Sequence, residues 1–283
     1  MIINIVIKNI PNQIEKKLIS LINFKPYMCY DEISKNELLK FEAFCNINKD
    51  SNITKGLFIS LRNTCIRLKM INKHHVLIEN KEKIIKDYVD NKMDILKIST
   101  KYDGSPLNIL RIIFSDIYPK TSLKILVNDN NKSLLQDYDR KQFLTAINYD
   151  KFAVINQDEM HKESLLFEKD IEKLLIKSNI KYKTQDTLSN EQIKKYGKSI
   201  CTPDFLILSQ LVINGIDIKW IDAKNFYGSN NKFVINSIKK QTEKYIKSYG
   251  PGAVIFKLGC NEKLLFDNIL CFDYNLLSMI VNN

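Results

Sequence analysis

The chain carries two aspartates and a lysine at the two open ends of what reads as one β-hairpin. Residues 201–224 (CTPDFLILSQLVINGIDIKWIDAK) begin near Asp204, turn at the Asn-Gly pair 214–215, and end with Asp222 and Lys224. Asn-Gly between two apolar runs is the strongest short-range signal for a two-residue hairpin turn. Because the open ends of a hairpin lie together, the sequence predicts that both carboxylates and the lysine meet.

This set of side chains suits the hydrolysis of a phosphodiester bond. That reaction uses a metal ion, which offsets the charge of the phosphate and provides a hydroxide near neutral pH. Mg²⁺ takes oxygen ligands, commonly one or two carboxylates with waters and substrate phosphate. Asp204, Asp222 and the Ala223 carbonyl are the predicted ligands of Mg²⁺ or Mn²⁺, and Lys224 is predicted to position or activate the water. The alternative is a surface hairpin whose ends happen to be charged, since Asp-x-Lys is a common triplet.

Strand geometry predicts which way these side chains face. Asp222 and Lys224 are two residues apart, so both leave the same face of a strand. A regular ladder from the two-residue turn would set Asp204 opposite Asn225, on the wrong face. We therefore expect a β-bulge or a longer turn, near residues 209–210, that corrects the ladder by one residue. In a regular hairpin, Asp204 would have to reach in from a bent strand start.

A third acid is expected from an amphipathic helix at residues 161–178, where Glu163, Glu168 and Glu172 compete. Apolar residues lie at helical offsets from Glu168, and they are Leu165, Ile171 and Leu175. An inward carboxylate is costly unless it is paired or binds a metal. Glu168 is therefore the predicted third carboxylate of the site, both as a metal ligand and as a catalytic residue.

The helix after the hairpin offers a second set of polar residues. Gln241 and Tyr245 are four residues apart and share a face, from which Gln241 is expected to orient Lys224 or a phosphate. Lysines flank the pair, and they are Lys239, Lys240, Lys244 and Lys247. With Tyr245, the first three are predicted to hold a phosphate backbone. The alternative is that these lysines are an ordinary solvated helix face.

The elements that must position these residues read as a mixed α/β unit from about residue 155. Their order is a helix, three strands, a helix and a strand, with an antiparallel hairpin leading into a crossover helix. The predicted strands are 180–184, 205–213, 216–224, 252–259 and 268–273, and the crossover helix is 232–249. Residues 188–197 read as a loop with a helical turn.

Residues 11–150 read as mainly helical, and residues 82–117 among them have the pattern of a helix-turn-helix. A short helix ends at Tyr102, a turn follows at 103–105, and Pro106 suits the first position of the next helix. If this segment binds DNA, its last helix presents Asn108 and Arg111 to a groove. The alternative is an ordinary helical bundle.

The composition fits a reduced, intracellular globular protein with a polyanionic partner. Lys and Arg number 43 against 32 Asp and Glu, a net charge of +11, although an AT-rich genome would also fill a surface with lysine. Six scattered cysteines without a CxxC pair, and only three histidines, argue against a zinc site. Apolar runs stay below the roughly 18 residues of a membrane span, so no membrane association is expected.

Taken together, these elements and motifs resemble the PD-(D/E)XK nuclease superfamily. The motifs are the Pro-Asp at 203–204, the Asp-Ala-Lys at 222–224, an upstream Glu and a downstream Gln-x-x-x-Tyr of the RecB-like branch. TPDFLI, WIDAK and QTEKYIKSYGPGAVIF resemble more narrowly the TPD-motif family, which includes the eukaryotic codanin-1-interacting nuclease. LKISTKYDGSPLNILRIIF is similar to a segment of that family's helical N-terminal part.

The resemblance implies a metal-dependent nuclease. It places Glu168, Asp204, Asp222, Lys224 and Gln241 at the superfamily's catalytic positions. Asp222 departs from the Glu of the animal members, and its shorter side chain changes the metal geometry without excluding activity. For the animal members, the resemblance also implies a codanin partner and a nuclear location.

We therefore predict a mainly helical region at 1–151 and a PD-(D/E)XK nuclease-like domain at 152–283. The expected substrate is nucleic acid, DNA rather than RNA, and the expected location is the nucleus of a eukaryote or the cytoplasm. The rival hypothesis is a catalytically silent nucleic-acid-binding or scaffold protein that acts with a codanin-like partner. A restriction-type or repair enzyme would share the chemistry and differ in substrate.

Overall fold

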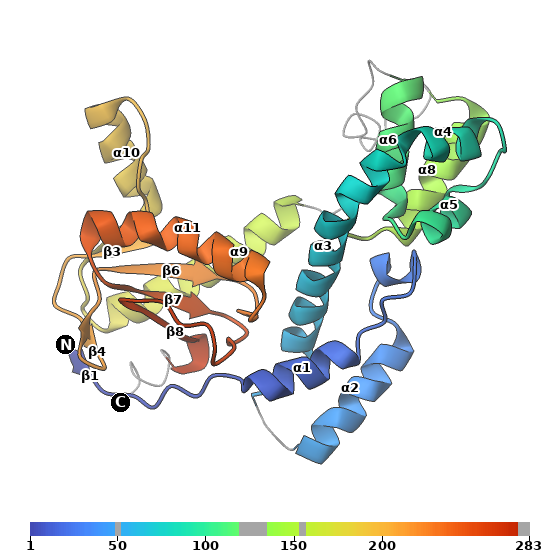
Figure 1. The fold of residues 1–283 in the computed structure, drawn as a ribbon. Helices are drawn as coiled ribbons and strands as arrows, with labels where there is room; N and C mark the ends of the chain where they lie inside the picture. Colours follow the sequence, from blue (N-terminus) through green and yellow to red (C-terminus); the bar gives the residue numbers. More distant parts are fainter. Residues whose placement is uncertain (49–51, 119–134, 153–156, 277–283) are drawn as a thin grey trace. The chain divides into compact units, whose positions relative to one another are not determined.

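The computed structural model, drawn in Figure 1, describes residues 1–48, 52–118, 135–152 and 157–276. The chain forms two units, each built from more than one stretch of sequence. The α/β unit comprises Met1–Ser20, Cys45–Leu61 and Gln157–Asn283, and the helical unit comprises Leu21–Phe44 and Arg62–Asn156. The fold is therefore mixed α/β. The boundary predicted at residue 152 lies beside residues 153–156, which are outside the described part of the chain.

A five-stranded sheet in the order β2-β3-β6-β7-β8 is the centre of the α/β unit. The strands are β2 (Tyr182–Thr184), β3 (Phe205–Ile207), β6 (Trp220–Lys224), β7 (Gly252–Phe256) and β8 (Ile269–Asp273). β3 runs antiparallel to β2 and β6, whereas β6, β7 and β8 run parallel. A parallel neighbour requires a crossover connection, which α11 (Lys232–Tyr249) makes between β6 and β7.

The two faces of this sheet are covered by different helices. Ile221 and Ile255 pack in one cluster with residues of α9 (Gln157–Lys177), whereas Trp220 and Val254 pack in another with residues of α11. Side chains alternate between the faces of a strand. Asp222 and Lys224 have the parity of Trp220, so their side chains leave the sheet on the α11 side.

A smaller sheet, β1-β4-β5, forms from the hairpin turn and the N-terminus. It contains β4 (Val212–Ile213), β5 (Ile216–Asp217) and β1 (Ile2–Ile3), which lies parallel to β4. The predicted turn is confirmed, with positive φ angles of 49° at Asn214 and 80° at Gly215, as a type I′ turn requires.

The hairpin is interrupted where the sequence predicted a bulge, but by three residues instead of one. Ile218 N donates to Leu211 O (2.7 Å), and Ile207 N donates to Lys219 O (2.8 Å). Residues 208–210 therefore have no counterparts on the opposite strand. They turn toward β2 instead, where Leu208 N donates to Lys181 O (2.7 Å). An odd number of extra residues restores the parity that the site needs.

Helix α10 (Gln185–Tyr196) corrects the prediction of a loop with a helical turn. Its ends have ordinary signals, since Thr184 caps the first turn and Gly197, at φ 74°, ends the last. Leu188 is its single buried residue, so the sequence shows no apolar periodicity there. In Figure 1, α10 stands away from the sheet of the α/β unit.

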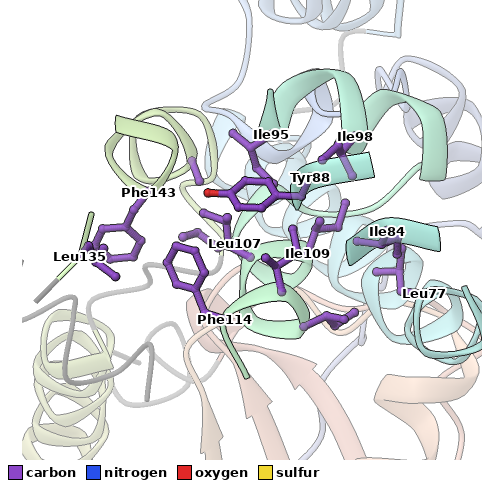
Figure 2. Close-up of a cluster of buried hydrophobic side chains, with 14 residues drawn as sticks. Leu77, Ile84, Tyr88, Ile95, Ile98, Leu107, Ile109, Phe114, Leu135 and Phe143 are labelled. Atoms are coloured by element: carbon purple, nitrogen blue, oxygen red, sulfur yellow. The ribbon is translucent and has the colours of Figure 1, made fainter. Parts of the chain in front are cut away.

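The described residues between 11 and 150 are mainly helical, as the sequence predicted. The helices are α1 (Asn12–Ser20), the short 3₁₀ helix η1 (Met28–Tyr30), α2 (Lys35–Asn48), α3 (Lys55–Glu79), α4 (Lys81–Val89), α5 (Ile95–Tyr102), α6 (Pro106–Ile117) and α8 (Asp137–Tyr149). Helices α2 and α3 each contribute residues to both units. Figure 2 shows the core of the helical unit, where Tyr88, Leu107 and Phe114 meet side chains from α3 and α8.

The predicted turn between α5 and α6 is confirmed, but α6 lies at the centre of the bundle. Ser105 caps α6, Pro106 occupies its first turn, and Asp150 also accepts a hydrogen bond from Leu107 N (3.2 Å). Seven of its residues are buried, namely Pro106, Leu107, Ile109, Leu110, Ile112, Ile113 and Phe114. Arg111 is exposed and donates to Asn108 Oδ1 (3.3 Å). The ordinary-bundle alternative explains this burial.

Within the described residues, the helices are all too short or too polar to pass through a lipid bilayer.

Candidate active site

Asp204 and Asp222 meet across the β3–β6 ladder. Phe205 pairs with Ile221, so the same register, continued by one residue, sets Asp204 opposite Asp222. Ala223 N donates to Asp204 Oδ2 at 2.6 Å, which fixes the Asp204 carboxylate beside β6. Asp222 is fully buried, whereas Asp204 is half-buried. The three-residue bulge is what brings the two acids together, because a regular ladder would point Asp204 away.

Lys224 and Gln241 complete a hydrogen-bonded cluster around Asp222. Lys224 Nζ lies 2.5 Å from Asp222 Oδ2 and donates to Gln241 Oε1 at 2.9 Å. Gln241 Nε2 donates to Asp222 Oδ1 at 3.1 Å and to Tyr245 Oη at 2.8 Å. Both amide hydrogens and the amide oxygen of Gln241 are therefore used. The side chain is held in one orientation, and it holds Lys224 in turn.

Burial and mutual repulsion disfavour the charged forms of both aspartates. Burial, with the charge of Asp222, raises the pKa of Asp204 to about 8, against the lowering effect of the Ala223 N–H. Burial also raises the pKa of Asp222, and the neighbouring Lys224 opposes that rise. Two carboxylates thus share one ammonium, so the site has room for one more positive charge near neutral pH.

The donor atoms fit Mg²⁺ or Mn²⁺. Asp222 Oδ2 is buried and receives no donor in hydrogen-bond geometry, although Lys224 Nζ lies close to it. Carboxylate oxygens are hard ligands of the kind that these ions prefer. Within the described residues, however, no three His, Cys, Asp or Glu side chains gather in a metal-holding cluster. An ion here would have two protein carboxylates at most, with its other ligands from carbonyl oxygen, water or substrate, as is usual for Mg²⁺.

Glu168 lies half-buried on α9, within electrostatic reach of the pair. Burial first, and then the charge of Asp222, raises the pKa of Glu168. The two competing acids are differently placed, since Glu163 is exposed and Glu172 Oε1 accepts from Tyr182 Oη at 2.8 Å. Of the three, Glu168 is the one that the charge of Asp222 reaches, but in the described residues it does not join Asp204 and Asp222 in a metal-holding cluster, so its role as a metal ligand stays a prediction.

The buried face of α9 differs from the predicted face. Phe167, Ile171 and Leu175 are buried, whereas Leu165 is 41% exposed. The helix is therefore rotated from the orientation that the sequence suggested, which places Glu168 beside the buried stripe instead of on it.

Tyr245 occupies a different place from the predicted phosphate-binding one. It is 6% exposed, its ring meets Trp220 edge-on with centroids 5.1 Å apart, and its hydroxyl donates to Thr202 O at 3.3 Å. Tyr245 thus orients Gln241 by accepting its amide hydrogen bond, and its burial keeps it from contacting a nucleic acid. Lys239, Lys240 and Lys244 are exposed, as that prediction requires.

Sequence reasoning missed a buried acid that holds the loop between β6 and α11. Glu15 of α1 accepts from Tyr227 Oη (2.8 Å), Asn261 Nδ2 (2.7 Å) and Asn230 N (3.1 Å). It fixes the loop that carries the chain from Lys224 to Gln241. The sequence signal for it was the position of Glu15 three residues before Leu18, which puts both on one helix face.

The candidate site lies in a part of the chain that is similar to other proteins. A similar curated protein is "Uncharacterized protein L539" of Acanthamoeba polyphaga mimivirus, which is 26% identical over 242 residues, or 84% of this chain and 83% of that protein. No solved structure matches the chain. Residues 136–275, which include every residue of the candidate site, match the family model described as "Protein of unknown function TPD sequence-motif".

Proposed function

We propose that the protein is a metal-dependent nuclease that hydrolyses phosphodiester bonds in nucleic acid. The observation that carries the proposal is the bulge-dependent meeting of Asp204 with Asp222, beside a Lys224 that Gln241 holds in place. An exposed pair of charges at a hairpin end would not need such an arrangement. Asp222 is fully buried and pairs with Lys224, while its burial and the nearby Asp204 leave the two carboxylates with a single ammonium between them.

The residues divide the work of such a reaction between them. Asp204 and Asp222, with the Ala223 carbonyl, would hold Mg²⁺ or Mn²⁺, which when bound stabilises charge on a phosphate and lowers the pKa of a water. Lys224 keeps one ammonium hydrogen on Gln241 and directs the others toward Asp222 and the reacting water or phosphate oxygen. Glu168 would receive a proton or bind through water.

The order of elements supports a PD-(D/E)XK restriction-endonuclease-like core. Helix α9 precedes the β3–β6 ladder, and α11 then crosses to the parallel strand β7, as in the resemblance drawn from the sequence. The net charge of +11 and the exposed lysines of α11 favour a polyanionic substrate, and the choice of DNA over RNA rests on the resemblance.

Other parts of the proposal rest on resemblance alone. They are a codanin-like protein partner and a nuclear location if the source is eukaryotic, whereas the cysteine composition is what favours an intracellular location. A DNA-gripping role of the helical unit also stays a prediction, and it depends on the exposed face of α6 that carries Arg111.

Cleavage of labelled DNA and RNA in Mg²⁺, Mn²⁺ or EDTA tests the proposal. Wild type is compared with Asp222→Asn and Lys224→Ala. The hairpin offers a matched control, because Asp217 and Lys219 have the same Asp-x-Lys spacing and pair at 2.6 Å with partly exposed side chains. We expect metal-dependent cleavage that both site variants lose, and that Asp217→Asn and Lys219→Ala keep.

Two outcomes would contradict the proposal. Cleavage that survives both site substitutions would place the activity elsewhere. Absence of cleavage with retained nucleic-acid binding would favour the silent binding or scaffold protein instead.

A further inference from the structure

Helix α10 and the segment that returns from it form a braced projection, which we call the α10 arm (residues 185–201). Gln192 ties its two sides together, since its Oε1 accepts from Ile200 N (2.7 Å) and Cys201 N (2.9 Å). Its Nε2 donates to Cys201 O (2.6 Å). These hydrogen bonds hold the arm in one shape away from the sheet, where Figure 1 shows α10 (light orange) projecting.

The tip of the arm exposes an apolar and basic surface. Ile193, Tyr196 and Ile200 are each about half exposed, at 48%, 53% and 53%. Three lysines lie among them, all exposed, and they are Lys194, Lys195 and Lys198. Lys195 Nζ stands 5.0 Å from the centre of the Tyr196 ring. In the described part of the chain, these lysines have no ion pair with a carboxylate, whereas Lys183 at the arm's base pairs with Glu191 at 2.7 Å.

Such a surface matches the chemistry of a single nucleic-acid strand. Lysines attract the phosphates, and an exposed aromatic ring stacks on a base, whose face is free in a single strand and hidden in a duplex. A purely apolar partner would leave three ammonium groups desolvated and unpaired, which is costly. The interleaved charges therefore favour an anionic strand over an apolar protein surface.

The base of the arm is joined directly to the candidate site. Gln185 N donates to Asp204 O at 3.0 Å, and the charge of Asp186 contributes to the raised pKa of Glu168. Helix α10 has 12 residues, so it spans about 18 Å at the α-helical rise of ~1.5 Å per residue. Phosphates along one strand of a duplex lie about 3.4 Å apart, and an unstacked single strand is more extended, so the tip lies at most roughly five nucleotides from the site.

We propose that the α10 arm binds a single-stranded segment of the substrate, with phosphates on its three lysines and an unpaired base on Tyr196. The distance from the scissile phosphate rests on the proposed nuclease function. The binding itself does not, because it requires only the surface at the tip.

Binding without cleavage tests the arm first. Fluorescence anisotropy of a labelled 20-nucleotide single strand in EDTA compares wild type with two arm variants. One is the triple variant Lys194→Ala, Lys195→Ala and Lys198→Ala, and the other is Tyr196→Ala. A matched control removes the same charge from exposed lysines elsewhere in the α/β unit, namely Lys16, Lys17 and Lys263. A Lys→Arg version of the arm triple tests rescue.

The salt dependence is measured as the slope of log K against log [salt]. We expect the triple lysine variant of the arm to reduce the magnitude of this slope by about 2, because each phosphate neutralised on a single strand contributes ~0.7. Tyr196→Ala should weaken binding roughly tenfold, within the range for removal of one stacked base. The control triple should change the salt dependence by less than half as much, and Lys→Arg should restore binding. Equal effects of the arm and control triples would overturn the inference, as would an unchanged affinity in Tyr196→Ala.

Substrate length then connects the arm to the site. On a cleaved strand with eight nucleotides on the arm side of the scissile bond, wild type should exceed the arm triple in kcat/KM by about tenfold or more. On a strand with two nucleotides there, the two should be equal. If the arm variants weaken binding but wild type cleaves no substrate, the nuclease proposal is wrong and the proposal for the α10 arm stands. If wild type cleaves but the arm variants change neither binding nor cleavage, the arm proposal is wrong and the nuclease proposal stands.

Discussion

The fold raises the pKa of both Asp204 and Asp222, the two acids at the centre of the candidate site. The pKa of Asp204 rises to about 8 from an unfolded value near 3.9, so the folded protein holds a proton that the unfolded chain releases. The contribution of Asp204 to folding stability in EDTA should therefore be greatest below about pH 4 and be lost as the pH rises to about 8. Asp204→Asn should raise Tm at pH 8, and have little effect at pH 4.

Asp87 provides a control of opposite sign for that experiment. Hydrogen bonds from Lys101 and Tyr102 lower the pKa of Asp87. Its contribution is therefore present above about pH 4 and lost on acidification. Asp87→Asn should lower Tm at pH 8 and approach the wild-type Tm at lower pH. If Asp204→Asn and Asp87→Asn shift Tm in the same direction at pH 8, the assigned environment of Asp204 is wrong.

Gln241 carries the second prediction, because it connects Lys224, Asp222 and Tyr245. Gln241→Ala removes all three hydrogen bonds, and removal of such an orienting partner typically costs 10- to 100-fold in metal affinity or activity. We expect that reduction in metal-dependent cleavage, with a change in unfolding free energy of only about 1–3 kcal/mol. Glu243→Ala, at an exposed position of the same helix, should leave both quantities nearly unchanged. Equal activities of the two variants would contradict the role of Gln241.

The sequence predicted which residues gather around Asp222 better than it predicted which way their side chains point. Asp204, Asp222, Lys224 and Gln241 were expected together, and the structure brings them together. Tyr245 was expected to face a nucleic acid, but it is buried under Trp220. A spacing of four residues says that two side chains share a helix face, and it does not say whether that face meets solvent or a sheet.

At the scale of elements, the three-residue bulge decides whether the site forms. Deleting one of residues 208–210 leaves an even number of extra residues, so Asp204 must turn to the other face or the ladder must distort. Deleting two leaves one extra residue and restores the parity. We expect the single deletion to abolish metal-dependent cleavage, and the double deletion to retain more of it. Cleavage assays with matched Tm measurements check this order, and the reverse order would refute the parity argument.

The Tyr-Gly-Pro-Gly segment that ends α11 has a packing role that gives another prediction. A Cβ on Gly252 would lie 2.2 Å from the Trp220 ring, so no side chain fits there. Gly252→Ala must displace Trp220 from its hydrogen bond to Gly250 O, and overpacking of this kind costs about 1–3 kcal/mol. Gly197→Ala is the control, because its surroundings are open and it meets only the strain of its positive φ, roughly 1 kcal/mol. Urea unfolding should show the larger decrease in stability for Gly252→Ala.

Elements with strong local signals were predictable, and elements defined by distant partners were not. The Asn-Gly turn and the start of α6 at Pro106 were predicted from sequence and confirmed. Helix α10 was missed because it buries almost nothing, and the size of the bulge depends on Lys181, which pairs with it from beside β2. The pairing of β1 with β4, some two hundred residues along the chain, leaves no local pattern to read.

At the scale of the whole molecule, the similarity to the mimivirus protein reaches beyond the motif region. The match covers 242 residues, or 84% of this chain, so it is much longer than the stretch 136–275 that matches the family model. A recognition helix must present an exposed face to DNA bases, and the exposed face of α6 is narrow, since seven of its 12 residues are buried.

Basic residues were expected to bind DNA in two places, on α6 and on α11. Arg111 is the exposed cation of α6, and Lys239, Lys240 and Lys244 are exposed on α11 next to the candidate site. Each phosphate that a protein neutralises on duplex DNA adds ~0.9 to the salt slope. Replacing the three α11 lysines by alanine should reduce that slope by about 2 or more, and Arg111→Ala should change it by well under 1. Anisotropy titrations over a range of salt concentrations measure both. A larger effect of Arg111 would return DNA binding to the helix-turn-helix, because only a helix that contacts the duplex could produce it.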